Sequence, residues 1–442
     1  MRRYFQLGLL HVALALTALP MDSTLNRVMI QELGLPATLA VLLVSLPYLF
    51  APVQIAVGVL ADRRPMAGRR RTPYILIGLL LSVAGVAAAP GALFTLAADP
   101  VLGWTLCALA FGAWGLGFNF ATASYFALAS ELFGEQRRSR AVAVMYFMMI
   151  LTMIGMGITL GRLMDPYTPA ALMQAVWVAA GAALAAGLTG LIKLEPVSPA
   201  QPPALRSAAA PGAGGWLEGL RAQLGVVTGN RPARIFFVYL LILLTAILGQ
   251  DVILEPYAAQ AFALPVSQTT RLTSLYGVCF LAALLLAAAA ERFVNKRTVA
   301  QIGAAGGIAA FGLILIAGAL GQLGLFYLGL VLLGLAIGLA TVSNHSLMLD
   351  MTTPQNVGLF IGAWGMATSL ARLAGSLLGG VLRDSVAALV GDPLLGYELA
   401  FALNASLLAL SLGLLRSVDA GRFRRRADQP NVVEQIALAQ EA

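Results

Sequence analysis

Charge is scarce in this chain, and the shortage decides its class. Asp, Glu, Lys and Arg make up 11% of its 442 residues, whereas soluble domains carry about 25%. Hydrophobic residues make up 59%, and the mean hydropathy is +0.85. Too few charged side chains remain to cover a water-exposed surface, so the sequence predicts an integral membrane protein. Short segments of alternating polarity, which an outer-membrane barrel requires, are also missing, and the long apolar runs indicate an all-α protein.

Cysteine and histidine are rare too, with two residues of each kind. Cys107 and Cys279 both fall in apolar runs, so we expect no disulfide, and two histidines suggest no metal site. The chain also lacks a nucleotide-binding loop, paired catalytic carboxylates outside the apolar runs, and a nucleophile with a partnered histidine, so we expect no enzyme. Arg2 and Arg3 precede an apolar run that is too long for a cleavable signal.

Twelve apolar segments are long enough to cross a membrane, which takes about 20 residues. Their predicted limits are 6–31, 37–61, 73–96, 101–129, 139–161, 170–192, 233–260, 271–290, 298–319, 324–349, 357–382 and 395–415. The basic residues between them lie almost all on one side. The five exceptions among 28 are Arg27, Arg162, Arg271, Arg372 and Arg383. By the positive-inside rule, both termini are expected in the cytoplasm.

The two halves of the chain are related in sequence. Asp62-Arg63 after the second span has a counterpart in Glu291-Arg292 after the eighth, and at the same offset Asp22 matches Asp251. This pattern predicts two parallel six-helix repeats. We therefore divide the chain into a bundle at 1–193, a Pro-rich cytoplasmic linker at 194–232, a second bundle at 233–416 and a cytoplasmic tail at 417–442.

The loop between spans 2 and 3 carries the most recognisable motif. Gly58-Val-Leu-Ala-Asp62-Arg63, followed by Gly68-Arg69-Arg70-Arg71, resembles the signature of the major facilitator superfamily. The resemblance implies that fold, with Asp62 contacting the start of span 11 near Val357 and latching an outward-open state. Glu291-Arg292 would form a second latch. A plain positive-inside loop is the alternative.

Polar residues inside the spans are the candidate ligand-binding groups. Asp22, Asn26 and Arg27 lie in span 1, and Gln250, Asp251 and Glu255 lie at the matching depth in span 7. These residues would line a central cavity or pair with one another, and Arg27 could instead snorkel to the interface.

Arg372 in span 11 is either functional or paired with an acid such as Asp251 or Glu255. His345, next to Asn344, could ligate the magnesium of a chlorophyll-type pigment or be only hydrogen-bonded, and His11 has the same ambiguity.

Two sets of residues predict packing. The methionines of span 5 form either a flexible filler or a groove for a flat pigment or isoprenoid tail; they are Met145, Met148, Met149, Met153 and Met156. Three glycine pairs predict close helix contacts, namely Gly157/Gly161, Gly334/Gly338 and Gly375/Gly379.

Two further stretches resemble a narrower family. Ser23–Pro36 contains T-L-N-R-V-M-I-Q-E-L, and Ser45–Gln54 is followed by Gly-Arg-Arg-Arg-Thr-Pro. Both are similar to the PucC/LhaA family, the bacteriochlorophyll-delivery branch of the superfamily, and Asn26, Arg27 and Glu32 belong to its mark. The resemblance implies a factor in the photosynthetic inner membrane that assembles light-harvesting or reaction-centre complexes. Its partners would be antenna polypeptides, pigment-biosynthesis enzymes and bacteriochlorophyll or chlorophyll.

A second hypothesis comes from a different class. The chain could be a proton-coupled transporter of a small solute, with Asp22, Asp251 or Glu255 as the proton carrier.

Overall fold

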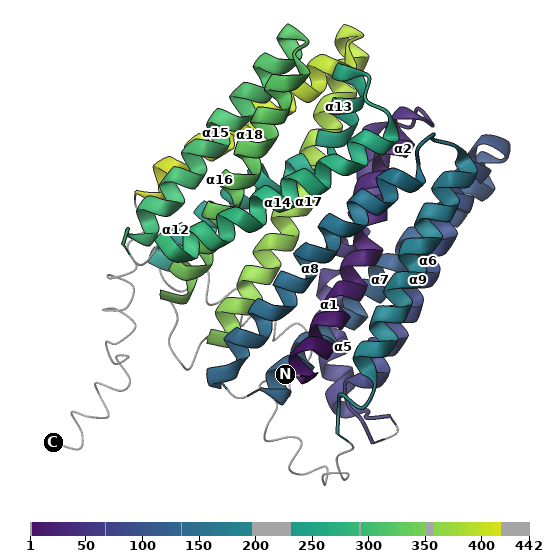
Figure 1. The fold of residues 1–442 in the computed structure, drawn as a ribbon, viewed down its shortest axis with the longest axis vertical. Helices are drawn as coiled ribbons and strands as arrows, with labels where there is room; N and C mark the ends of the chain where they lie inside the picture. Colours follow the sequence, from purple (N-terminus) through teal and green to yellow (C-terminus); the bar gives the residue numbers. More distant parts are fainter. Residues whose placement is uncertain are drawn as a thin grey trace.

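The computed structural model describes residues 2–66, 68–133, 135–196, 231–290, 293–350 and 357–416. In this part of the chain helices dominate, and short loops join them (Figure 1). The first half contains α1 (Arg2–Leu19), η1 (Pro20–Leu25), α2 (Asn26–Gln31), α3 (Ala37–Val44), α4 (Leu46–Leu49), α5 (Ala51–Arg63), α6 (Thr72–Ala98), α7 (Pro100–Leu132), α8 (Glu135–Leu163) and α9 (Pro169–Leu191). The second half contains α12 (Arg231–Gly249), η2 (Gln250–Val252), α13 (Leu254–Phe262), α14 (Val266–Ala290), α15 (Lys296–Leu320), α16 (Leu323–Asp350), α17 (Val357–Val390) and α18 (Pro393–Leu415).

The chain is a multi-pass membrane protein of the predicted all-α class. Eleven helices of the described residues are long and apolar enough to cross a membrane. The segment 37–61, which we expected to be a single span, consists of the short helices α3, α4 and α5. Pro47 and Pro52 stand in the first turns of α4 and α5, where a residue without an N–H group can begin a helix but not continue one.

The broken second span is held against α7 by two amide side chains. Asn119 of α7 donates a hydrogen bond of 2.8 Å to the Pro47 carbonyl, and Gln54 donates one of 2.7 Å to Asn119 Oδ1. These bonds satisfy polar groups that lipid could not, which stabilises the irregular backbone at this depth.

The first helix of each half is interrupted at the same place. In the first half a π-helical segment, η1, carries Asp22, and in the second half a 3-10 segment, η2, carries Asp251. The two aspartates match in the sequence repeat, so the repeat extends to the local backbone. Irregular helix turns at membrane depth are often functional sites because they free backbone groups and turn side chains toward the interior.

The helices run between two ends of the molecule. The near end carries Arg2 and the loop 64–71, and the far end carries the loops 32–36, 263–265 and 391–392 (Figure 1). Figure 1 shows α1 to α9 gathered on one side and α12 to α18 on the other. Of the linker 194–232, only 194–196 and 231–232 are described, and the tail 417–442 lies outside the described residues.

Glycines allow the closest helix contacts, as the paired spacing predicts. A Cβ atom on Gly161 would lie 2.7 Å from the Ser267 oxygen of α14, and one on Gly338 would lie 2.7 Å from the Phe280 oxygen. At Gly375 it would lie 2.4 Å from the Thr245 oxygen of α12. The three predicted pairs therefore each include a glycine at a tight helix crossing.

The α6–α7 crossing gives a direct test of this packing. A Cβ atom on Gly117 would lie 2.4 Å from the Ser82 nitrogen and 2.5 Å from the Gly78 oxygen. Gly117→Ala should therefore lower the stability of the protein by about 1–3 kcal/mol, because neither backbone can move away. Gly112→Ala on the same helix is the control, since no heavy atom lies within 4 Å of its added carbon. Thermal unfolding in detergent checks this, and equal melting temperatures for the two variants would contradict the packing.

Candidate functional site

A charged cluster lies where the two interrupted helices meet. Arg372, halfway along α17, donates a hydrogen bond of 2.6 Å to Asp251 Oδ2 of η2. Gln250 donates one of 2.6 Å to the other oxygen of Asp251. The predicted salt bridge of Arg372 is therefore present, and Asp251, not Glu255, is its acid.

Asp22 joins this cluster through Tyr48 of α4. The Tyr48 hydroxyl donates a 3.5 Å hydrogen bond to Asp22 Oδ2, and the Arg372 guanidinium lies over the Tyr48 ring, 5.2 Å from its centroid. The cluster thus contains residues of both halves, and it places two carboxyl groups near one guanidinium. The side chains of Arg372 and Asp251 remain 28% and 26% exposed, so solvent or a ligand can reach charges in the middle of the spans.

Polar side chains of the segment 23–31, which include Asn26 and Arg27, connect the two halves of the chain. Ser23, Asn26, Arg27 and Gln31 form hydrogen bonds from the first helix to the second half of the chain, and we call these bonds the far-end brace. Ser23 donates to Glu255 Oε1 at 2.5 Å, Asn26 to the Val252 carbonyl at 2.6 Å, Arg27 to the Leu264 carbonyl at 3.3 Å and Gln31 to the Pro256 carbonyl at 3.2 Å.

The contacts of two brace residues, Asn26 and Arg27, have a clear physical basis. Pro256 has no N–H group, so the carbonyl of Val252, four residues earlier, receives no helical hydrogen bond from it, and the Asn26 amide takes its place. Arg27 is 4% exposed and forms an ion pair with Glu32. Its ion-pair partner Glu32 lies in the far-end loop 32–36, so the guanidinium is both paired within the protein and directed toward that end of the molecule.

Helix contacts at the same end continue the brace. Asp384 of α17 accepts hydrogen bonds of 3.0 and 2.7 Å from the backbone nitrogens of Ala37 and Thr38, at the N-terminus of α3. A carboxylate there is favoured by the helix dipole and by the unpaired N–H groups of the first turn. On the other side of the interface, Ser274 of α14 donates to the Ile154 carbonyl of α8 at 2.8 Å.

The arginine-rich loop at the near end is tied within the first half. Gly68 has φ 69°, a left-handed conformation that glycine adopts readily, which explains its place in the motif. Arg71 pairs with Glu131 of α7 at 2.9 Å, and the second carboxylate oxygen of Glu131 lies 3.6 Å from Arg70. The side chains of Asp62 and Arg63, together with all of Glu291, Arg292 and 351–356, lie outside the described residues, so the latch remains a prediction.

Glu195 is a near-end residue that the sequence did not single out. Its carboxylate accepts hydrogen bonds from the backbone nitrogens of Arg70, Arg71 and Thr72, at 2.7, 3.1 and 2.6 Å, where α6 begins. Burial alone would raise the pKa of this carboxyl, but the hydrogen bonds from Thr72, Arg70 and Arg71 outweigh burial and hold the pKa below its ordinary value. Thr72-Pro73 signals a helix start, but no local pattern tells which distant acid caps it.

The two histidines differ in how many of their ring nitrogens have a hydrogen-bond partner. In His11, Nδ1 lies 2.5 Å from the Tyr125 hydroxyl and Nε2 lies 2.8 Å from the Met149 sulfur. In His345, Nδ1 lies 2.8 Å from the Thr341 carbonyl, and the side chain is exposed. His11 is thus part of the packing of the first half, while His345 keeps an accessible ring nitrogen.

The described residues contain no group of three or more His, Cys, Asp or Glu that could hold a metal ion. Cys107 and Cys279 are free and buried. The methionines of α8 fill gaps in the helix packing; for example, Met148 lies against Gly8 and Met145 is fully buried.

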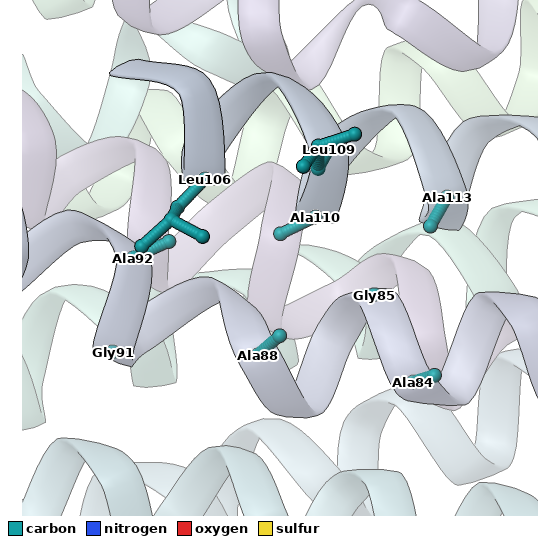
Figure 2. A pocket seen from close by; sticks show the side chains of 9 residues that line it. All are labelled: Ala84, Gly85, Ala88, Gly91, Ala92, Leu106, Leu109, Ala110 and Ala113. Atoms are coloured by element: carbon teal, nitrogen blue, oxygen red, sulfur yellow. The ribbon is translucent and has the colours of Figure 1, made fainter. Parts of the chain in front are cut away.

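A groove of about 380 Å³ lies between α6 and α7 (Figure 2). Figure 2 shows its small and apolar side chains along two neighbouring helices, namely Ala84, Gly85, Ala88, Gly91, Ala92, Leu106, Leu109, Ala110 and Ala113. None of these side chains can donate or accept a hydrogen bond, so the groove offers contact area and no chemistry.

Comparisons with known proteins give consistent matches along the chain. The family model described as "PUCC protein" matches residues 24–423. The protein PucC of Cereibacter sphaeroides is 32% identical, over 96% of this chain and 94% of its own length. PucC of Rhodobacter capsulatus is 30% identical, over 93% and 90%, and a protein of that species named "Bacteriochlorophyll synthase 44.5 kDa chain" is 28% identical, over 96% of both chains.

Solved structures share the fold. A mutant of the peptide transporter POT superposes with a TM-score of 0.69 at 16% identity, covering 95% of each chain. A bacterial homologue of the human lysosomal transporter Spinster gives 0.68 at 12% identity, covering 98% of this chain and 99% of the other. These similarities confirm the predicted fold of the major facilitator type.

The Glu195 cap predicts a pH-dependent stability. Because its pKa is lower in the folded protein than in the unfolded chain, the carboxylate stabilises the fold fully above the unfolded value of about 4.3. This contribution is lost as the pH falls through the folded-state pKa. Glu195→Gln should therefore lower the melting temperature at pH 7, and the difference from the unmutated protein should shrink below about pH 4. A difference that grows on acidification would contradict the cap.

The ionic cluster predicts coupling between Arg372 and Asp251. Arg372→Met leaves two carboxyl groups without their cation and should destabilise the protein, and adding Asp251→Asn should recover part of the loss. A double-mutant cycle on the free energy of unfolding should give a coupling of about 0.5–3 kcal/mol. Arg383→Met, whose guanidinium pairs with Asp384 at the far end, is the control. Coupling of Asp251 to Arg383 as large as to Arg372 would refute the assignment.

Proposed function

Because the chain belongs to the PucC protein family, we propose that it is a membrane assembly factor for photosynthetic complexes. It binds bacteriochlorophyll or chlorophyll, or delivers it to antenna polypeptides, as light-harvesting or reaction-centre complexes form. The observation that carries this proposal is the family match over residues 24–423. The relative named for bacteriochlorophyll synthase, which aligns over 96% of both chains, supports the link to this pigment.

The role is one of binding and not of catalysis. One relative carries the name of a synthase, but three charged groups of the described spans have hydrogen-bond or ion-pair partners within the protein. Asp251 and Arg372 pair with each other, and Glu255 accepts hydrogen bonds from Ser23 and Thr273. None of these groups is a nucleophile beside a general base, the arrangement that covalent catalysis uses.

The protein lies in a bacterial inner, photosynthetic membrane with both termini in the cytoplasm. The basic residues of the near end support this orientation, since Lys and Arg accumulate on the cytoplasmic side. Arg2, Arg64, Arg70, Lys193 and Arg297 all lie there. Its partners are antenna polypeptides or a reaction-centre complex, and pigment-biosynthesis enzymes that would supply the pigment at the same membrane.

A proton-coupled transporter of a small solute is the second candidate, and the central cluster favours it. Asp22 and Asp251 stand at helix interruptions, and the Asp251–Arg372 pair is partly exposed. Discontinuous helices near the middle of the membrane are typical of transporter sites. Uptake driven by a proton gradient into vesicles, abolished by Asp251→Asn with Glu255→Gln at unchanged protein level, would favour transport over assembly.

The assembly role is tested by antenna abundance in the native host. Deleting the gene should reduce the light-harvesting complexes seen by absorption of the membranes, and the plasmid-borne gene should restore them. The double variant Asp251→Asn, Glu255→Gln should restore them as well when an immunoblot shows normal amounts, because assembly requires no proton carrier. Antenna complexes of normal abundance in the deletion strain would contradict the proposal.

A further inference from the structure

One histidine in the spans has a ring nitrogen without a hydrogen-bond partner among the described residues. The Thr341 carbonyl can only accept a hydrogen bond, so the 2.8 Å contact with His345 Nδ1 places the ring proton on Nδ1. Nε2 then carries a lone pair, and the exposed side chain makes it accessible. Metal-binding histidines show the same arrangement, in which one ring nitrogen donates to a backbone carbonyl and the other faces the metal.

The surroundings of His345 restrict which metal it could bind. No group of three His, Cys, Asp or Glu occurs among the described residues, so a bare ion would find too few protein ligands here. A single imidazole suits a metal that brings its own equatorial ligands and has one axial position open. Magnesium held by the four nitrogens of a chlorin meets this condition.

One aromatic ring lies directly beside this position, and a second ring lies behind it. The Trp364 ring of α17 lies 4.4 Å from the His345 ring, centroid to centroid, at a tilt of 44°. The Phe236 ring of α12 lies 6.4 Å from that of Trp364. The indole of Trp364, itself backed by the fully buried Phe236, thus offers an apolar face beside the imidazole, which fits a flat and apolar macrocycle better than a small hydrophilic solute.

The neighbouring residue fixes the helix that carries the histidine. Asn344 accepts a 2.6 Å hydrogen bond from the Tyr239 hydroxyl of α12 and donates one of 2.7 Å to the Ala340 carbonyl. Asn344 is 2% exposed, whereas His345 points outward from the same turn. The predicted ligand candidate Asn344 thus has a positioning role, and the ring nitrogen is held in a defined direction.

We infer that His345 Nε2 is the axial ligand of a magnesium chlorin bound beside Trp364, near the near end of α16. This inference rests on the proposed function for the class of pigment, and it assigns the site within that function. When bound, the pigment supplies the metal, and the chain supplies the imidazole, its orientation by Thr341 and the adjoining indole. His11, with both ring nitrogens engaged, has no such role.

The test is a spectroscopic titration of the full-length protein in detergent or nanodiscs. Chlorophyllide a and bacteriochlorophyllide a are the magnesium chlorins, and pheophorbide a, which has no metal, is the comparison. The expected result is saturable binding of the magnesium chlorins, with the absorption shift of an added axial ligand. Pheophorbide should bind to the unmutated protein at least tenfold more weakly than the magnesium chlorins do. The His345→Phe variant should bind the magnesium chlorins at least tenfold more weakly and show no such shift.

Two further variants separate ligation from folding. His345→Gly with added imidazole should regain the absorption shift, because free imidazole can occupy the axial position. His11→Gln should bind the magnesium chlorins as the unmutated protein does. Equal affinity of pheophorbide, or an unchanged spectrum in His345→Phe, would overturn the inference.

The outcome is independent of the assembly test. Reduced antenna abundance in the deletion strain together with no axial shift in the titration would overturn this site and leave the assembly role standing. Normal antenna abundance together with His345-dependent chlorin binding would support the site and overturn the assembly role.

Discussion

The far-end brace is the constraint on which the rest of the structure depends. Lipid offers no hydrogen bonds, so each polar group in a span must find a partner within the protein. Pro256 leaves the Val252 carbonyl without a helical donor, and Asn26 of the opposite half supplies one at 2.6 Å. Asp384 does the same for the N-terminal nitrogens of α3. The two halves therefore complete one another's backbone, and separating them would expose unpaired groups that cost several kcal/mol each in lipid.

This constraint divides the polar residues of the first helix between two tasks. Asn26, Arg27 and Gln31 hold the halves together at the far end, while Asp22, one turn earlier, joins the half-exposed cluster with Tyr48 and Arg372. The second set is charged and partly exposed, as a binding site requires, whereas Asn26 and Arg27 of the first set are buried at the contact between the halves. His345 lies apart from both sets, in the second half of the chain toward the near end.

The repeat in the sequence predicted the position of the central cluster but not the hydrogen bonds of the far-end brace. Matching Asp22 with Asp251 placed both at one depth, and an arginine in a span calls for an acid, so the sequence offered Asp251 and Glu255 as partners of Arg372. The structure selects Asp251. Partners that depend on distant backbone groups were not foreseeable. Nothing near Asn26 indicates that a proline in another helix frees a carbonyl for it. The interruption of 37–61 was also missed, because hydropathy remains high through α3, α4 and α5 and does not register helix breaks.

The central claim is that the halves are joined at the far end, and cysteine cross-linking tests it most directly. A Cβ atom on Gly380 would lie 3.2 Å from the Thr38 Cα atom, so the two backbones touch across the interface at these positions. Thr38→Cys with Gly380→Cys should cross-link nearly completely in native membranes under mild oxidation. Thr38→Cys with Leu389→Cys, at an exposed position of the same helix, should not. Absence of the first cross-link, or equal yields for both pairs, would contradict the account.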